Sequence, residues 1–304
     1  MMTDKRLAEA GTRSTVRTVS PTTWKTCLKQ AARVYTVPTS RMRPLPEFLI
    51  IGAQRCGTTS LYKYLAEHPR FVSATLRTKG VHFFDTSYDK GMAWYRAHFP
   101  TTAYRALFRA RNGADLVTGE ASPYYLFHPQ VPYRLAQHLP SVKLIVMLRD
   151  PIERTYSQWQ HELSRGFEHL DRFEDALDAE DGRLAGEVKR MDADPDYASF
   201  SHQHHSYMAR SRYADQIEVY RSLFPAAQIH AVKAEDFFSD PGVEYARVLE
   251  FLGLPAHDLG DYKKHNGYKR TAMDPATRER LVAHFADSNR RLVEMLGPRF
   301  SWGE

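Results

Sequence analysis

Hydrophobic and polar positions alternate along this chain in blocks that predict strands separated by helices. Short apolar runs predict strands at 47–51 and 142–149, with shorter or weaker ones at 81–84, 116–118 and 229–233. Apolar residues at helical spacing predict helices at 58–68, 152–163, 205–223, 243–252 and 275–296. Residues 165–205 are polar and acidic, with only a weak helix at 173–177. The alternation favours one α/β domain, a central parallel sheet with helices on both faces.

The domain is expected to span residues 47–304, because residues 1–46 differ in composition. This arm holds nine Lys or Arg and two acidic residues, so its net charge is +7. The whole chain has a net charge of +6, so the remaining residues together carry −1. Its proline-rich end at 38–46 is expected to be a linker. We expect the arm to be a solvated tail. Contact with an anionic membrane surface is the alternative, and no nucleic-acid partner is expected.

The longest aliphatic runs are far shorter than the roughly 20 residues that span a bilayer. No apolar stretch near Met1 is typical of a secretory signal. The two cysteines, Cys27 and Cys56, are expected to be reduced thiols, although one disulfide is the alternative. These features favour a cytoplasmic protein.

A glycine-rich loop at 52–57 follows a predicted buried strand and precedes a predicted helix. Backbone N–H groups at a helix N-terminus attract anions, and Gly57 would allow close approach of the backbone. The spacing matches the phosphate loop of nucleotide triphosphatases, but Thr58 replaces the lysine that kinases place on the β- and γ-phosphates. Arg55 instead supplies a cation, which suits one phosphate and its leaving bridge without an obligate metal.

A second anion-binding position is predicted at the end of the strand 142–149. Ligands of open α/β sheets collect at the carboxyl ends of strands. Arg149 lies there, and Ser157 follows about two turns into the next helix. Together they would suit a phosphomonoester. The alternative is that Arg149 pairs locally with Asp150.

These segments resemble the sulfotransferases that use 3′-phosphoadenosine-5′-phosphosulfate (PAPS), most closely the heparan sulfate glucosaminyl branch and its bacterial relatives. The resemblance covers about residues 47–302. It is carried by Phe48–Leu61, by Val142–Gln160 with Leu-Arg-Asp-Pro, by Lys79–Asp85, by Glu120–Tyr124 and by Asn289–Gly297.

The resemblance implies a sulfotransferase fold, PAPS as donor and 3′-phosphoadenosine 5′-phosphate (PAP) as product. It places the donor's 5′-phosphosulfate on the loop and helix start, at Arg55, Cys56, Gly57, Thr58, Thr59 and Ser60. It places the 3′-phosphate on Arg149 and Ser157, helped by Lys269 or Arg270. The implied acceptor is a hydroxyl or amine of a carbohydrate, glycolipid or small molecule.

Two positions depart from the family pattern. Arg55 stands where lysine is common, so a planar fork replaces a point charge. Gly80 stands where the heparan branch often has a glutamate base. His82 is then our first candidate for the base, because residues i and i+2 of a strand share a face and imidazole suits this role. Glu120 is the second.

Other polar and aromatic groups have competing interpretations. His202, His204 and His205 are expected to lie in a solvated loop, since no matched ligand spacing indicates a metal site. Trp94, Tyr95, Tyr124 and Tyr125 could line an acceptor cleft or pack in the core. Cys56 could be reactive but is expected to pack.

The alternatives to a sulfotransferase are a nucleotide kinase or triphosphatase of the phosphate-loop type, and a relative that binds PAPS without catalysis. The missing lysine argues against the first, and Gly80 motivates the second.

Overall fold

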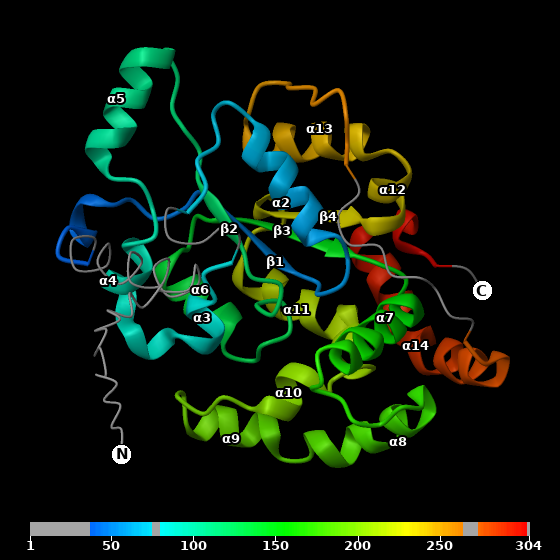
Figure 1. Cartoon of the computed structure of the whole chain (residues 1–304). Helices are drawn as coiled ribbons and strands as arrows, with labels where there is room; N and C mark the ends of the chain where they lie inside the picture. The colour runs from blue at the N-terminus through cyan, green and yellow to red at the C-terminus, as the bar shows by residue number, and fades with distance from the viewer. Residues whose placement is uncertain (1–36, 75–79, 264–272, 303–304) are drawn as a thin grey trace, which may run out of the picture.

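The computed structural model describes residues 37–74, 80–263 and 273–302. Within these residues, four parallel strands form one sheet in the order β2-β1-β3-β4 (Figure 1). The strands are β1 (Phe48–Gly52), β2 (Gly119–Ala121), β3 (Lys143–Leu148) and β4 (Ile229–Lys233). Because every pairing is parallel, the carboxyl ends of all four strands share one edge. The loops that follow β1 and β3 therefore lie side by side.

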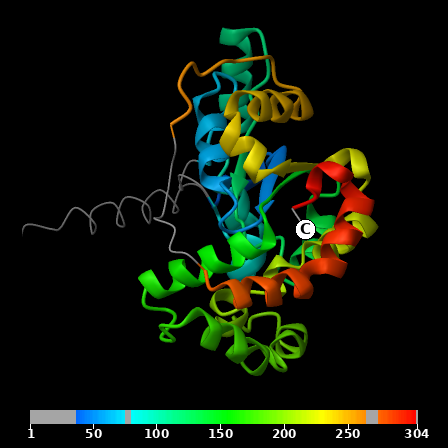
Figure 2. The same cartoon turned by 90° about the vertical axis from the view of Figure 1, so that its right-hand side faces the viewer.

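Helices lie on both faces of the sheet (Figures 1 and 2), so the predicted α/β architecture is confirmed. The longer ones are α2 (Thr58–Glu67), α5 (Thr102–Asn112), α6 (Val131–His138), α7 (Pro151–Ser164), α8 (Phe173–Leu184), α11 (Tyr213–Leu223), α13 (Pro241–Leu252) and α14 (Pro275–Leu296). The shorter ones are α3 (Phe83–Thr86), α4 (Gly91–Arg96), α9 (Glu187–Ala193), α10 (Phe200–His204) and α12 (Ala234–Ser239). Single 3-10 turns are η1 (Ser40–Met42), η2 (Tyr88–Lys90), η3 (Ala209–Ser211), η4 (Ala226–Gln228) and η5 (Pro298–Phe300).

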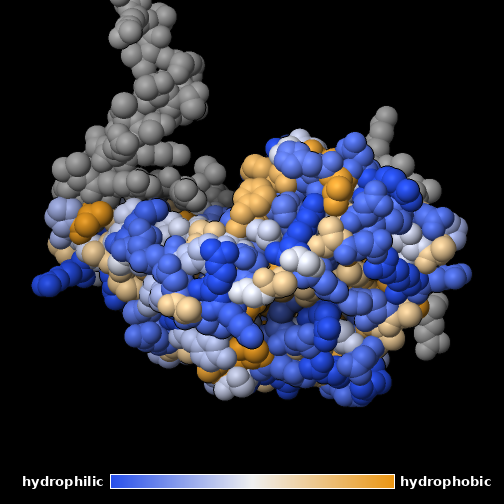
Figure 3. Space-filling view, turned by 90° about the horizontal axis from the view of Figure 1, so that it is seen from below, coloured by the Kyte–Doolittle hydropathy of each residue, from blue (hydrophilic) through white to orange (hydrophobic). Residues whose placement is uncertain are grey.

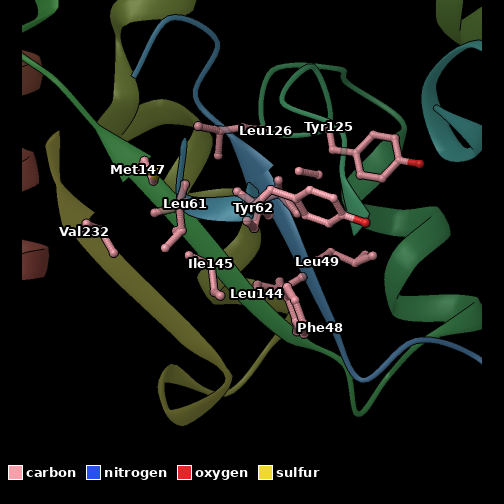
Figure 4. Packing of buried hydrophobic residues seen from close by; sticks show 14 of the residues in the cluster. Phe48, Leu49, Leu61, Tyr62, Tyr125, Leu126, Leu144, Ile145, Met147 and Val232 are labelled. Carbon is pink, nitrogen blue, oxygen red and sulfur yellow. The ribbon is translucent and has the colours of Figure 1, made fainter. Parts of the chain in front are cut away.

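The core lies between the sheet and its helices. All five residues of β1 are buried, and Leu61 and Tyr62 of α2 join the same cluster as Leu144 and Ile145 of β3 (Figure 4). Burial of each large apolar side chain stabilises the fold by about 1.5–3 kcal/mol. This packing holds the start of α2 rigidly at the carboxyl edge of the sheet.

The predicted helix at 205–223 begins later than expected, at Tyr213. The polar stretch that showed only a weak helix contains three, α8, α9 and α10, of which α8 packs against α7 and α10. The strand expected at 116–118 is displaced to β2, while Val117 makes an isolated parallel bridge with Phe71.

The strand expected at 81–84 is wrong. His82 has a left-handed backbone (φ 54°, ψ 43°) and precedes the helical turn α3. The N–H groups of Val81 and His82 donate to the side chains of Glu120 and Ser122, at 2.5 and 3.0 Å. Side chains in and just after β2 thus take the donors that a neighbouring strand would have bound.

The end of the proposed linker packs on the domain. Arg43 is 5% exposed, and its Nη1 donates to the carbonyl oxygen of Phe99 at 2.5 Å. The surface seen in Figure 3 is mostly hydrophilic, with hydrophobic residues in small groups. No helix among the described residues is long and apolar enough to cross a membrane.

Candidate active site

The loop between β1 and α2 presents a helix N-terminus at the carboxyl edge of the sheet. Gly57 is the N-cap of α2 with φ 94°, and the first turn holds no acidic residue. The positive φ favours glycine here, and a Cβ on Gly57 would lie 2.9 Å from the exposed ring of Phe238, which would have to move. The ten-residue helix places the positive end of its dipole at this loop, which suits an anion.

The predicted donor-loop residues differ in exposure. Cys56, Thr58 and Ser60 are buried, whereas Arg55, Gly57 and Thr59 are half-buried. Burial raises the pKa of the Cys56 thiol to about 11, although Arg154 and Arg149 oppose the shift. The thiol therefore stays protonated, which supports the interpretation that Cys56 packs rather than reacts.

Arg55 connects the two predicted anion positions. Its Nε donates to Ser157 Oγ at 3.2 Å, so the loop after β1 and helix α7 after β3 are in direct contact. Arg149 is also half-buried, and its Nη2 lies 3.5 Å from Glu153 Oε2, one turn along α7. The local pairing with Asp150 that stood as the alternative is not seen, because the Asp150 side chain caps α7 and Arg149 lies against Glu153 instead.

A helix N-terminus, two arginines and a serine hydroxyl thus meet at one edge. This set of donors fits a molecule with two phosphate-like groups, as PAPS has. The other two predicted donor residues, Lys269 and Arg270, lie outside the described residues.

On the far side of β1, the imidazole of His82 is held by the carboxylate of Asp85. Its Nδ1 lies 2.8 Å from Asp85 Oδ2, and Asp85 is fully buried as a side chain while His82 is 35% exposed. With Nδ1 facing the carboxylate, the other ring nitrogen, Nε2, is the one that could accept a proton. A Cβ built on Gly80 would lie 3.1 Å from His82 Nε2. The imidazole nitrogen therefore lies next to the place where a side chain at position 80 would begin.

Position 80 also has no room for a side chain of its own. The same Cβ would lie 2.5 Å from the carbonyl oxygen of Ala121 and 2.9 Å from Ser122 Oγ. Gly80 and His82 are thus two parts of one arrangement, in which the loop approaches β2 closely and the histidine fills the adjoining space.

Glu120, the second candidate base, has no exposed surface. Its Oε2 accepts from the Val81 N–H and from Ser122 Oγ (2.7 Å), and its Oε1 accepts from the hydroxyls of Tyr125 and Tyr95 at 2.9 and 3.2 Å. Burial raises its pKa, which these donors and His82 partly offset. Four donors and complete burial make Glu120 an anchor for the loop that carries His82, which argues against a role as base.

Arg55 and His82 share a further property. They are the non-glycine residues with positive φ in the described chain, at 71° and 54°. Such backbone conformations cost energy and gather at functional sites. Two residues selected from sequence for different roles are thus both held in unfavourable conformations.

Sequence reasoning gave no role to two buried arginines near the loop. Arg154 on α7 has no exposed surface and donates to Ser211 Oγ and Gln158 Oε1, at 2.5 and 2.6 Å. Arg210, in η3, is 1% exposed and donates to Gln54 Oε1. Their spacing carries no pattern that marks buried cations, because their partners come from distant segments.

The histidines expected in a solvated loop are packed, and that prediction is wrong. His202 is 3% exposed, stacks on Phe127 at 4.3 Å between centroids, and its Nδ1 bonds the Tyr124 hydroxyl at 2.7 Å. His204 Nδ1 lies 2.9 Å from Glu162 Oε2, and His205 Nε2 lies 2.9 Å from the carbonyl oxygen of Phe167. In the part of the chain that the structure describes, no cluster of His, Cys, Asp or Glu could hold a metal ion.

The four aromatic residues with two interpretations belong to the core. Trp94, Tyr95, Tyr124 and Tyr125 are between 0% and 9% exposed. They are packed side chains, and Tyr95 and Tyr125 donate their hydroxyls to Glu120.

Comparison with known proteins gives consistent matches. The sulfotransferase domain family matches residues 45–291. Heparan sulfate glucosamine 3-O-sulfotransferase 3B1 of Homo sapiens is 33% identical over 292 residues, covering 86% of this chain and 66% of that protein. Membrane-associated sulfotransferase kil1 of Dictyostelium discoideum is 26% identical over 323 residues, covering 85% of this chain and 66% of that protein. The chain thus spans just under two thirds of the length of these two relatives.

A solved structure of a sulfotransferase from Alicyclobacillus acidocaldarius superposes with a TM-score of 0.60. It is 30% identical in sequence, and the match covers 83% of this chain and 96% of that one.

Proposed function

The chain belongs to the sulfotransferase domain family, whose members take a sulfuryl group from PAPS, and from this premise we propose that it sulfates a hydroxyl group of a carbohydrate or glycolipid. The observation that carries the proposal is the place of His82 Nε2, 3.1 Å from where a side chain at position 80 would begin. The acceptor hydroxyl must lose a proton as it is sulfated, and this nitrogen is the base that we assign to it.

The charge of the domain favours a neutral or weakly charged acceptor. Residues 47–304 have a net charge of −1, so the positive charge of the chain lies in its N-terminal arm. Heparan sulfate, which appears in the name of one relative, is a long polyanion. A domain that binds such a chain is expected to carry an excess of positive charge. We therefore place a neutral sugar or a glycolipid first, and a phenolic or other small hydroxyl compound second.

The residues have distinct parts in the proposed reaction. PAPS, when bound, supplies a sulfuryl group activated by its 5′-phosphate. Arg55 and the start of α2 stabilise negative charge at the leaving phosphate. Arg149 and Ser157 bind the 3′-phosphate, and His82 takes the acceptor proton. Asp85 accepts from the Nδ1–H of His82, which selects the tautomer with a basic Nε2 and stabilises the imidazolium.

An amine acceptor is the alternative, suggested by the N-sulfotransferase name of another relative. Transfer from radiolabelled PAPS to a panel of neutral oligosaccharides, glycolipids, phenols, amino sugars and heparan fragments, with mass detection of products, tests the proposal. O-sulfated sugars or glycolipids are the expected products. Exclusive N-sulfation, or preference for phenols or polyanionic chains, would refute it. The cytoplasmic location expected from the sequence stays a prediction.

A further inference from the structure

The donor loop is held from inside the protein by Arg210, which has no part in the chemistry above. Its Nη1 donates to Gln54 Oε1, and Gln54 immediately precedes Arg55 in the loop. Its Nη2 donates to the carbonyl oxygens of His202 and Gln203, at 2.8 Å each. One guanidinium therefore ties the last turn of α10 to the donor loop.

The surroundings of Arg210 make this contact more than packing. The guanidinium carbon lies 5.0 Å from the ring centroids of both Tyr124 and Phe127. No carboxylate among the described residues lies within salt-bridge distance, and Nε is buried without a hydrogen-bond partner there. A buried cation is costly, so the hydrogen bonds that it makes fix their partners strongly.

Arginine settles the orientation of the Gln54 amide. A guanidinium has five donors and no acceptor, so only the amide oxygen can face it. The amide nitrogen is then the end of the side chain turned away from Arg210. Gln54 is half-buried, whereas Arg210 is 1% exposed, and Gln54 Nε2 is not among the buried polar atoms of the described residues that lack a hydrogen-bond partner. The loop thus holds an oriented donor, one residue from Arg55.

We propose that Gln54 Nε2 donates a hydrogen bond to the sulfuryl oxygens of the bound donor, and that Arg210 is the positioning residue that aims this amide. The inference rests on the proposed function through the placement of the phosphosulfate on the loop, but not through the acceptor or the base. It adds a contact that recognises the group to be transferred, where Arg55 contacts the leaving phosphate.

This assignment separates the affinities for donor and product. PAPS carries the sulfuryl group, and PAP does not. Removal of the Gln54 amide should therefore weaken PAPS binding and spare PAP binding. Loss of the loop structure would weaken both, because both molecules share the 5′-phosphate.

The test is calorimetric titration of the full chain with PAPS and with PAP, without acceptor. Gln54→Met keeps the length of the side chain and removes its polar end. We expect it to weaken PAPS binding by about tenfold, the scale of one hydrogen bond to a charged group, and to change PAP binding by less than about twofold. Arg210→Met should show the same selective loss for PAPS.

The double variant tests whether Arg210 acts through Gln54. Residues in one hydrogen-bonded unit give non-additive losses, so the double variant should lose no more PAPS affinity than the larger single loss. Arg210→Lys keeps the charge and one donor toward Gln54, so it should lose less PAPS affinity than Arg210→Met.

Arg43→Met is the matched control. Arg43 is 5% exposed and bonds a carbonyl oxygen, yet it contacts Phe99 rather than the donor loop. It should lower the melting temperature and leave the ratio of PAPS to PAP affinity unchanged. Equal losses of PAPS and PAP affinity in Gln54→Met, unchanged PAPS affinity, or additive losses in the double variant would overturn the proposal. If Arg210→Met does not fold, Gln54→Met and Arg210→Lys still decide it.

Discussion

Arg55 Nε donates a 3.2 Å hydrogen bond to Ser157 Oγ across 102 positions of sequence. The contact exists because β1 and β3 are parallel neighbours, which brings the loop after one strand against the helix after the other. The residue assigned to the 5′-phosphosulfate and the residue assigned to the 3′-phosphate therefore form one unit. A substitution at either residue should therefore alter binding at both phosphate positions.

Arg55 is predicted to supply most of the charge stabilisation at the leaving phosphate. Arg55→Ala should lower kcat by about 100-fold or more, the cost of losing one such electrostatic donor. Arg55→Lys should retain much of the activity, because the cation is kept. Steady-state transfer from labelled PAPS measures both, and near-normal turnover of Arg55→Ala would remove this residue from the mechanism.

Arg149 and Ser157 are predicted to recognise the 3′-phosphate. Arg149→Ala and Ser157→Ala should lose discrimination between PAPS and adenosine-5′-phosphosulfate, which lacks that phosphate. Competition binding gives the two affinities. Glu153→Gln is the control, since it removes the negative charge that lies 3.5 Å from Arg149 and 3.2 Å from Arg278, and it should preserve or raise discrimination. Undiminished preference for PAPS in both alanine variants would place the 3′-phosphate elsewhere.

His82 is predicted to be the general base, with Asp85 as its positioning residue. His82→Ala should lose roughly 10²–10⁴-fold in kcat and keep its affinity for PAP. Asp85→Asn should lose less and should alter the acidic limb of the pH–rate profile, because it removes the negative charge 2.8 Å from the imidazole while an amide oxygen can still accept from Nδ1–H.

Glu120 and Gly80 supply the matched comparisons for His82. Glu120→Gln should reduce stability more than chemistry, since an amide keeps one acceptor oxygen and places an N–H group against two of the four donors. Gly80→Glu should not restore a family-like base, because a side chain there meets the Ala121 carbonyl. A dead Glu120→Gln with an active His82→Ala would reverse the assignment.

Glu180 is predicted to make stability fall with rising pH. Burial raises its pKa to about 7 in the folded chain, from an ordinary value of 4.5. The unfolded chain therefore gives up this proton at lower pH than the folded one. The stabilisation is complete below about pH 4.5 and is lost as the pH rises through about 7, by a few kcal/mol at about 1.4 kcal/mol per pKa unit.

Urea unfolding at a series of pH values between these limits measures the slope. Glu180→Gln should flatten it, whereas Asp178→Asn, on the same helix and 63% exposed, should not. Glu180 accepts the N–H groups of Met208 and Ala209, at 2.7 and 2.8 Å. Its loss of a proton should therefore also affect the backbone next to Arg210. Parallel slopes for wild type and Glu180→Gln would contradict the prediction.

Catalysis is predicted to need no divalent metal. The loop has Thr58 where kinases have the lysine that works with magnesium, and Arg55 supplies the cation. Transfer should therefore be unchanged in EDTA. Complete loss that magnesium restores would contradict this view.

The sequence by itself determined the elements whose own residues dictate their form. The strand at Ile229–Lys233 and the helix at Pro275–Leu296 lie where their patterns placed them, because an apolar run or a 3.6-residue period is a local property. The glycine spacing of the loop and its place between strand and helix were equally local. Arg55, Arg149 and Ser157 could also be selected as candidates from the sequence, because their distances from the strand ends are counted along the chain.

Only the tertiary structure decided what depends on partners from distant segments. The expected strand at 81–84 became a left-handed turn, because Glu120 and Ser122 bind its N–H groups. His202 is buried because Phe127 and Tyr124 pack on it. Periodicity reports which face of an element is apolar, but not which side chain forty to eighty residues away will take a hydrogen bond. For the same reason the closeness of His82 Nε2 to position 80, and the Arg210–Gln54 contact 156 positions apart, emerge only when the chain is folded.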